Sequence, residues 1–174
     1  RNAKTLWRAL SIIANENKQF SKDVEIELVG FVGHAIVDEI KSLGLTGNLT
    51  LSDHISRKET LERMHRSQVL LLILNDMSNV NGRLPGKLFE YLASRRPVLV
   101  IGPGESDASK IVHGVNAGYT CDFNDLEKTI NTVKDLYEKF RQNNLPPNQT
   151  DISQYSNRNL TKKLAGYLDQ ITNK

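Results

Sequence analysis

The sequence lacks the features that mark several large classes of protein. Its single cysteine, Cys121, excludes a disulfide within the chain, and no apolar run is long enough to cross a bilayer. No run of Lys or Arg exceeds two residues, and the net charge is only +3. Because a nucleic-acid-binding protein usually carries a basic stripe, we expect no nucleic-acid partner, and a small anionic ligand suits the mild positive charge at least as well.

Motifs for several kinds of catalysis are also absent. The four histidines are scattered without HxxxH or CxxC spacing, so the sequence predicts no metal centre. There is no GxSxG elbow for a serine nucleophile and no GxxxxGK[ST] loop for a nucleoside triphosphate. Asp76 has no second acid nearby with which to hold a metal–diphosphate complex. The glycine-rich turns are therefore the candidates for ligand binding.

What the sequence does contain is a regular alternation of apolar strands and amphipathic helices. The connections between strands are too long for hairpins, which predicts a parallel sheet with helices on both faces. We therefore predict one α/β domain over residues 1–174, with three layers. The expected strands are 23–30, 48–51, 69–74, 97–101 and 118–122, and the expected helices are 3–20, 35–43, 56–66, 85–94, 106–115, 125–141 and 151–172, the last with a possible break near Ser156 and Asn157.

The first predicted element is a helix with no strand before it, and the chain starts at Arg1 without an initiator Met. We interpret the sequence as part of a longer protein that has lost its opening strand. On this interpretation the missing signal peptide carries no information.

The first candidate turn is Gly30-Phe-Val-Gly33, which follows a predicted strand and opens a predicted helix. In that context backbone N–H groups can bind a phosphate. A lone GxxG is a weak pattern, however, and an ordinary strand-to-helix turn explains it equally well.

The second candidate is the start of the predicted helix 85–94, which follows the strand 69–74. Open α/β sheets bind their ligands at the carboxyl ends of such strands. Lys87 adds positive charge to the already positive helix N-terminus, which costs a few tenths of a kcal/mol. A bound anion would reverse that balance, and Arg83 favours the same idea. Alternatively, Lys87 and Glu90 form an i, i+3 surface pair worth about 0.2–0.5 kcal/mol.

A third glycine-rich turn, Gly102-Pro-Gly104, precedes Ser106 and Asp107. Its glycines would permit the close approach of a ligand. We favour the simpler interpretation that Ser106 or Asp107 caps the next helix.

Taken together, Leu84-Pro-Gly-Lys-Leu-Phe-Glu-Tyr-Leu-Ala93 and Arg96-Pro-Val-Leu-Val100 resemble the donor-binding half of GT-B glycosyltransferases, particularly the retaining family 4 group. The resemblance extends over nearly the whole chain. It implies a Rossmann-like C-terminal domain that holds a nucleotide sugar, while a separate N-terminal domain holds the acceptor.

The resemblance also implies roles for individual residues. Glu90 matches the second glutamate of the family's E-x7-E motif, which accepts hydrogen bonds from the donor ribose. Eight positions earlier stands Gly82 instead of the first glutamate, so the acid that would hold the sugar's hydroxyls is absent. The implied donor-binding residues are Gly86, Lys87 and Arg83 near the diphosphate or sugar, Arg1 as the basic residue of an R/K-G segment, and Gly30, Phe31, His54 and Ile55 around the base.

The implied activity is transfer of a hexosyl group from a UDP- or GDP-sugar, usually with retention and without a metal or other cofactor. The 174-residue chain would be inactive alone, because it lacks the acceptor domain. The resemblance implies no protein nucleophile; it implies polysaccharide biosynthesis in the cytoplasm, with peripheral association at the inner membrane face as a further expectation. Two alternatives are a non-catalytic binding domain of the same fold and a sugar-nucleotide epimerase, which would need acidic and histidine catalytic groups that the chain does not show.

Overall fold

The computed structural model describes residues 2–76, 82, 84–145 and 151–172. Within these residues, strands and helices alternate as expected, and every strand pairing is parallel. The elements are α1 (Lys4–Glu16), α2 (Lys18–Asp23), β1 (Ile26–Val29), α3 (His34–Ser42), β2 (Leu49–Ser52), α4 (Arg57–Arg66), β3 (Leu70–Ile73), α5 (Gly86–Ser94), β4 (Val98–Ile101), α6 (Asp107–Gly114), β5 (Gly118–Cys121), α7 (Leu126–Arg141) and α8 (Asn157–Thr172), with short 3₁₀ turns at Thr46–Asn48 and Ser153–Tyr155.

The strands form two parallel sheets where a single sheet was expected. One sheet has the order β1-β2 and the other the order β3-β4-β5. In register, Leu28 of β1 lies opposite Leu51 of β2. In the larger sheet, Ile73 of β3 lies opposite Ile101 of β4. The prediction of an α/β fold with parallel strands is confirmed, whereas the prediction of one continuous sheet is wrong for the described residues.

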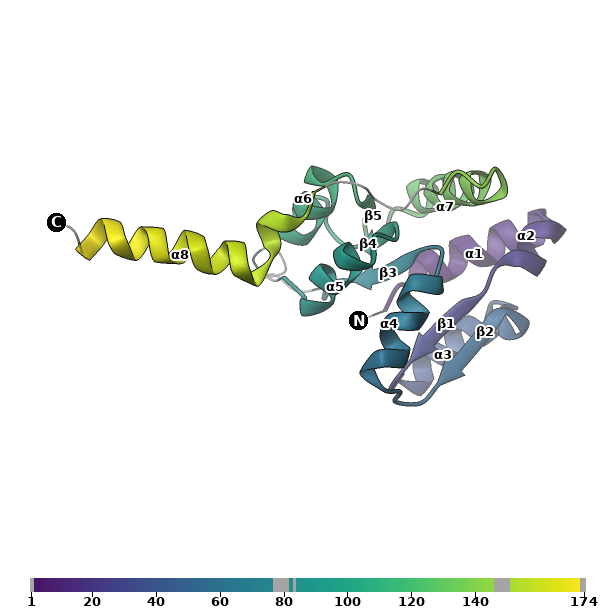
Figure 1. The fold of residues 1–174 in the computed structure, drawn as a ribbon. Helices are drawn as coiled ribbons and strands as arrows, with labels where there is room; N and C mark the ends of the chain where they lie inside the picture. Colours follow the sequence, from purple (N-terminus) through teal and green to yellow (C-terminus); the bar gives the residue numbers. More distant parts are fainter. Residues whose placement is uncertain (1, 77–81, 83, 146–150, 173–174) are drawn as a thin grey trace.

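Two hydrophobic cores lie on opposite faces of the strands. The first core joins α1, α3 and α7 to residues of both sheets, including Ile26 of β1 and Leu99 of β4, with Leu71 and Ile73 of β3 packed against it. The second core joins α5 and α6 to the other face of the larger sheet through Leu72 and Val100. Because one core runs beneath both sheets, they share a single helical layer (Figure 1).

Several helix boundaries follow directly from local sequence. The Ser56 side chain accepts a hydrogen bond from the Glu59 amide and caps α4, as the capping-box spacing predicts. Asp125 caps α7 in the same way. The expected helix 3–20 is divided in two, because the Asn17 side chain accepts hydrogen bonds from the Gln19 and Phe20 amides and starts α2.

The last helix makes little contact with the rest of the chain. After the 3₁₀ turn, α8 begins at Asn157, so the expected helix 151–172 is interrupted near Ser156. In Figure 1 it extends away from the sheets, and none of its residues is buried. Its apolar side chains Leu160, Leu164, Tyr167, Leu168 and Ile171 are exposed. Among the described residues, no helix combines the length and apolar character needed to cross a membrane.

Candidate functional site

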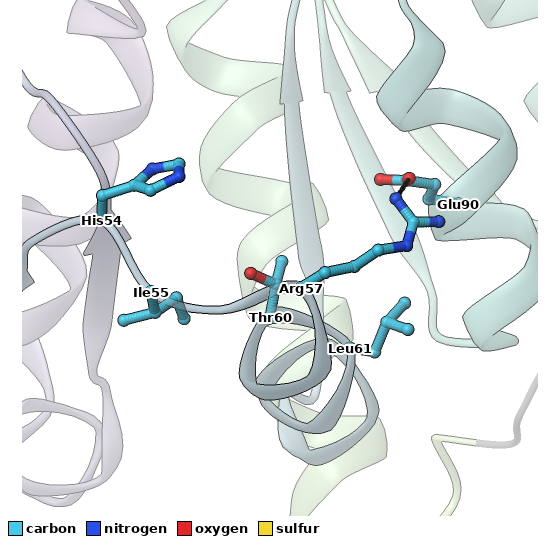
Figure 2. Close-up of a pocket in the computed structure, with 6 residues that line it drawn as sticks. All are labelled: His54, Ile55, Arg57, Thr60, Leu61 and Glu90. Carbon is cyan, nitrogen blue, oxygen red and sulfur yellow. Dashed lines mark hydrogen bonds and ion pairs between the residues drawn. The ribbon is translucent and has the colours of Figure 1, made fainter.

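A pocket of about 210 Å³ lies where α4 approaches α5. It contains three of the residues predicted from the sequence to bind a donor nucleotide: His54, Ile55 and Glu90. The first two lie in the segment after β2, and Glu90 lies on α5. The other lining residues are Arg57, Thr60 and Leu61 of α4. Figure 2 shows side chains from both sides of the pocket, with Arg57 extending from α4 toward Glu90.

The carboxyl ends of two strands bring these residues together. β2 ends at Ser52, and the chain passes through His54 and Ile55 before Ser56 caps α4. Glu90 lies in the second turn of α5, the helix after β3. Residues 36 positions apart in the sequence therefore face one pocket, at the strand ends where open α/β sheets bind ligands.

An ion pair crosses the pocket. Arg57 Nη1 lies 3.3 Å from Glu90 Oε1, and the two side chains are 79% and 40% exposed. Exposed pairs of this kind contribute about 0–1 kcal/mol, so a ligand could displace the arginine at small cost. Among the described residues, Lys87 makes no ion pair, and Glu90 pairs with Arg57. The structure therefore does not support the alternative of a Lys87–Glu90 surface pair.

A second titratable group lies beside Glu90. Burial, with a smaller contribution from the Glu90 carboxylate, raises the pKa of Tyr91 above its ordinary value. Tyr91 packs against the second hydrophobic core, as expected for a structural aromatic. Its hydroxyl is therefore neutral at physiological pH, and Arg57 and Glu90 bring one charge of each sign to the pocket.

The predicted diphosphate-binding residues of α5 are exposed but do not line this pocket. Gly86 and Lys87 are the first two residues of α5 and are open to solvent. Pro85, where the predicted helix 85–94 was expected to begin, is the N-cap of α5 and supplies no side-chain cap. The start of α5 thus presents a cation beside helix amides that no side chain caps.

The predicted turn at Gly30 and Phe31 lies at the end of β1, outside the pocket lining. Gly30 adopts a left-handed φ of 90°, which explains why glycine stands there. Its amide donates to the Ser52 carbonyl across a distance of 2.9 Å, which joins the ends of β1 and β2. Phe31 is 98% exposed, so it makes no contribution to the hydrophobic core.

The remaining predicted positions divide into two groups. Arg1 and Arg83 lie outside the described residues. Gly82, which stands where the family motif has its first glutamate, is exposed. In the third turn, the Ser106 side chain accepts a hydrogen bond from the Ser109 amide, which confirms the interpretation of Ser106 as a helix cap.

Three of the lining residues could not be predicted from a sequence pattern. Arg57, Thr60 and Leu61 belong to a polar helix whose sequence, Arg57-Lys-Glu-Thr-Leu-Glu62, resembles an ordinary solvent-facing surface. Their proximity to Glu90 depends on how α4 crosses the ends of the strands, which no local pattern encodes. Ser56, which caps α4, was the one local indication of their position, because it determines where the first turn of α4 begins.

A second hollow, of about 420 Å³, is lined by Asp125, Glu127, Lys128, Asn131 and Thr132 at the start of α7. None of the predicted site residues lies there, and its lining comes from one helix and its cap. We therefore take the pocket between α4 and α5 as the candidate site.

Within the described ranges, no group of three or more His, Cys, Asp or Glu side chains is placed to hold a metal ion. The residues available to a ligand in the candidate site are thus one carboxylate, one guanidinium, one imidazole, one hydroxyl and two aliphatic side chains. Comparison of the chain with protein-family models and with curated proteins finds no match in either.

Proposed function

We propose that this chain is the nucleotide-sugar-binding domain of a GT-B glycosyltransferase that resembles the retaining family 4 enzymes. The observation that carries the proposal is that His54, Ile55 and Glu90 line one pocket. The family resemblance implies each of these residues at the nucleoside end of the donor. The pocket also lies at the carboxyl ends of parallel strands, where nucleotides bind in α/β domains.

In this proposal Glu90 binds the hydroxyl groups of the ribose. A carboxylate can accept hydrogen bonds from both hydroxyls of a ribose, and such charge-assisted bonds are stronger than neutral ones. Arg57 occupies one carboxylate oxygen, Oε1. Within the described residues, the other oxygen has no hydrogen-bond donor. A ribose hydroxyl can therefore donate to Oε2 of Glu90 directly. The second hydroxyl reaches Oε1 once the weakly held Arg57 guanidinium is displaced.

The base would lie against the segment between β2 and α4. Ile55 and Leu61 supply apolar surface there, and His54 and Thr60 supply polar atoms. An arrangement of this kind suits a flat heterocycle with polar edges. We propose a uridine or guanosine diphosphate as the nucleotide part of the donor.

The diphosphate would extend toward the start of α5. Its charge suits the uncapped helix amides and the ammonium group of Lys87. During transfer, the bond between the anomeric carbon and the diphosphate oxygen breaks, and negative charge grows on the departing diphosphate. Fixed N–H dipoles and a nearby cation stabilise that charge in the transition state. The oxygen of the acceptor hydroxyl, held by a separate domain, forms the new bond to the anomeric carbon, and its proton passes to the departing diphosphate. We propose no nucleophile in this chain.

The proposal is tested by calorimetry and thermal shift with UDP, GDP, their sugar conjugates and 2′,3′-dideoxy-UDP. A binding diphosphate at a hundred times its Kd should stabilise the chain by about 2.7 kcal/mol. If Glu90 reads the ribose, removal of both hydroxyls should weaken binding at least about tenfold. The variant Glu90→Gln should lose most of that discrimination, because it removes the charge that strengthens the hydrogen bonds.

Glu62→Gln is the matched control, since Glu62 lies on α4 but not in the pocket lining. It should leave the affinity unchanged, whereas Lys87→Ala should weaken binding of diphosphates more than of nucleosides. Absence of binding by every nucleoside diphosphate at millimolar concentration would exclude the proposal.

One observation favours a second candidate, a binding domain without turnover. Gly82 stands where the resembling enzymes carry the glutamate that holds the sugar, and a glycine has no side chain to replace it. For such a domain, UDP-sugar and UDP would bind equally well, because the sugar adds no contacts. Tighter binding of one nucleotide sugar than of its free diphosphate would favour the transferase.

A further inference from the structure

Arg57 extends across the candidate site from α4 toward α5 (Figure 2). Its Nη1 atom lies 3.3 Å from Glu90 Oε1, and Lys87 stands three residues before Glu90, in the first turn of the same helix. Residues three apart on a helix share a face, with their Cβ atoms about 5–6 Å apart. The guanidinium of Arg57 therefore lies on the face of α5 that carries Lys87, close to the start of the helix.

The present position of Arg57 is held weakly. Its side chain is 79% exposed, and among the described residues its guanidinium makes one hydrogen bond, from Nη1 to Glu90. A guanidinium carries five N–H donors in a planar fork, so most of the donors of Arg57 remain available to a ligand. The single bonds of the side chain can turn the guanidinium while the backbone of α4 stays in place.

Arg57 and Glu90 neutralise each other only while they are paired. A ligand whose hydroxyl groups donate to both oxygens of Glu90 removes the guanidinium from Oε1. The positive charge of Arg57 then lies near Lys87 and near the first amides of α5, which no side chain caps. Positive groups gathered in this way favour an anion. Phosphate oxygens also match the planar fork of an arginine, which can bind two of them at once.

We propose that Arg57 exchanges partners when the donor binds. Its guanidinium leaves Glu90 as the ribose hydroxyls bind there, and it then holds the diphosphate of the same ligand together with Lys87. The exchange couples the two parts of the ligand, because the ribose releases the cation that the diphosphate binds. This inference rests on the proposed function, and it adds to the site a diphosphate-binding residue that the family resemblance does not include.

Two simpler roles of Arg57 predict a different result when the arginine is removed. If Arg57 only competes with the ligand for Glu90, Arg57→Ala should tighten the binding of uridine and of UDP by the same factor. If Arg57 only holds α4 beside α5, the same variant should weaken both by the same factor. Neither role changes the preference for UDP, which is the Kd of uridine divided by the Kd of UDP. The exchange of partners predicts that this preference falls, because only UDP loses a contact.

The test measures both dissociation constants by NMR titration of the 174-residue chain and of three variants. Arg57→Ala should lower the preference for UDP at least about tenfold, since it removes hydrogen bonds between charged groups. It should bind uridine as tightly as the unchanged chain or up to about fivefold more tightly, because the exposed ion pair that uridine must break is weak. Guanosine and GDP replace these ligands if the chain prefers GDP.

The other two variants separate the charge of Arg57 from its shape and its position. Arg57→Lys should recover part of the preference for UDP, because an ammonium group keeps the charge but lacks the planar fork. Lys58→Ala is the matched control. Lys58 is the next residue of α4, its side chain is 89% exposed and 4.0 Å from Glu62, and it does not line the pocket. Its removal should leave both dissociation constants unchanged.

The outcomes distinguish this inference from the proposed function. If the unchanged chain binds UDP and Arg57→Ala retains the same preference for UDP over uridine, the exchange of partners is overturned while the proposed function stands. A loss of preference in Lys58→Ala equal to that in Arg57→Ala would also overturn it, since any nearby cation would then suffice. If the unchanged chain does not bind a nucleoside diphosphate, the proposed function is rejected and this inference with it.

Discussion

Arg57 and Glu90 form an ion pair that joins α4 to α5 across the candidate site, with Arg57 Nη1 and Glu90 Oε1 separated by 3.3 Å. Both residues lie at the carboxyl-end side of the strands: Arg57 on α4, which leads from the smaller sheet to the larger, and Glu90 on α5, the crossover helix between β3 and β4. The pair therefore connects the two parts of the strand layer at the edge where a ligand would bind. The strength of this ion pair determines how easily a ligand can reach the Glu90 carboxylate.

We expect this ion pair to be weak. A double-mutant cycle with Arg57→Ala and Glu90→Ala, measured by urea unfolding, should give a coupling energy of about 1 kcal/mol or less. Because both side chains are substantially exposed, 0.5 M NaCl should reduce the coupling further. A coupling above about 2 kcal/mol would contradict the idea that a ligand can displace Arg57 cheaply.

Gly118 should tolerate no side chain. A Cβ atom at this position would lie 1.9 Å from the Val98 carbonyl oxygen on the neighbouring strand. Gly118→Ala must therefore push β5 away from β4 and should cost at least about 1–3 kcal/mol of unfolding free energy. In Gly114→Ala the new Cβ meets nothing within 4 Å, so this control should be close to neutral in the same denaturation experiment. Equal stability of the two variants would contradict the β4–β5 geometry.

Thr120 has a buried hydroxyl whose oxygen finds no hydrogen-bond partner among the described residues. Replacing it by a methyl group of the same shape removes the cost of desolvation, so Thr120→Val should stabilise the protein by about 1 kcal/mol. The matched control is Thr129→Val, because the equally buried Thr129 hydroxyl donates to the Asp125 carbonyl across 2.6 Å. That variant should lose about 1 kcal/mol. Thermal unfolding of both variants tests whether their stability changes have opposite signs. Destabilisation by Thr120→Val would show that the Thr120 hydroxyl is hydrogen-bonded.

Asp135 should contribute to the acid limb of the stability curve. Its Oδ2 atom accepts hydrogen bonds from Lys139 Nζ at 2.7 Å and from the Tyr119 hydroxyl at 3.0 Å. Chiefly the bond from Lys139, with help from Tyr119, holds the pKa of Asp135 below its ordinary value of 3.8. Since the pKa is lower in the folded state, this stabilisation is present above the unfolded pKa. It is lost as pH falls through the folded pKa.

Asp135→Asn should accordingly destabilise the protein at pH 6 and make stability fall less steeply between about pH 4 and pH 2. Urea unfolding at several pH values measures both effects. Asp169→Asn, an exposed change on α8 and outside this cluster, should retain the pH profile of the unchanged chain. An identical acid limb for Asp135→Asn would rule out a role for this carboxylate in acid unfolding.

Local sequence predicted much of the secondary structure. Ser56, Ser106 and Asp125 each cap a helix that was expected to begin at that residue, because a cap needs only a side-chain oxygen and an amide two or three residues away. Gly44 follows the expected end of α3 with a φ of 80°, as a residue past a helix C-terminus often requires. Parallel pairing followed from the same sequence, since connections of this length cannot form hairpins.

Other features depended on contacts between distant segments. The division of the strands into two sheets could not be predicted, because it depends on which backbone edges meet. The same holds for Arg57, whose neighbours in the sequence indicate a solvent-facing helix, yet whose guanidinium contacts Glu90 on another helix. The sequence alone thus determined the elements, their caps and the candidate carboxylate. Only the tertiary structure decided that Glu90 shares a pocket with His54, Ile55 and Arg57, because chain crossovers and side-chain packing bring distant residues together.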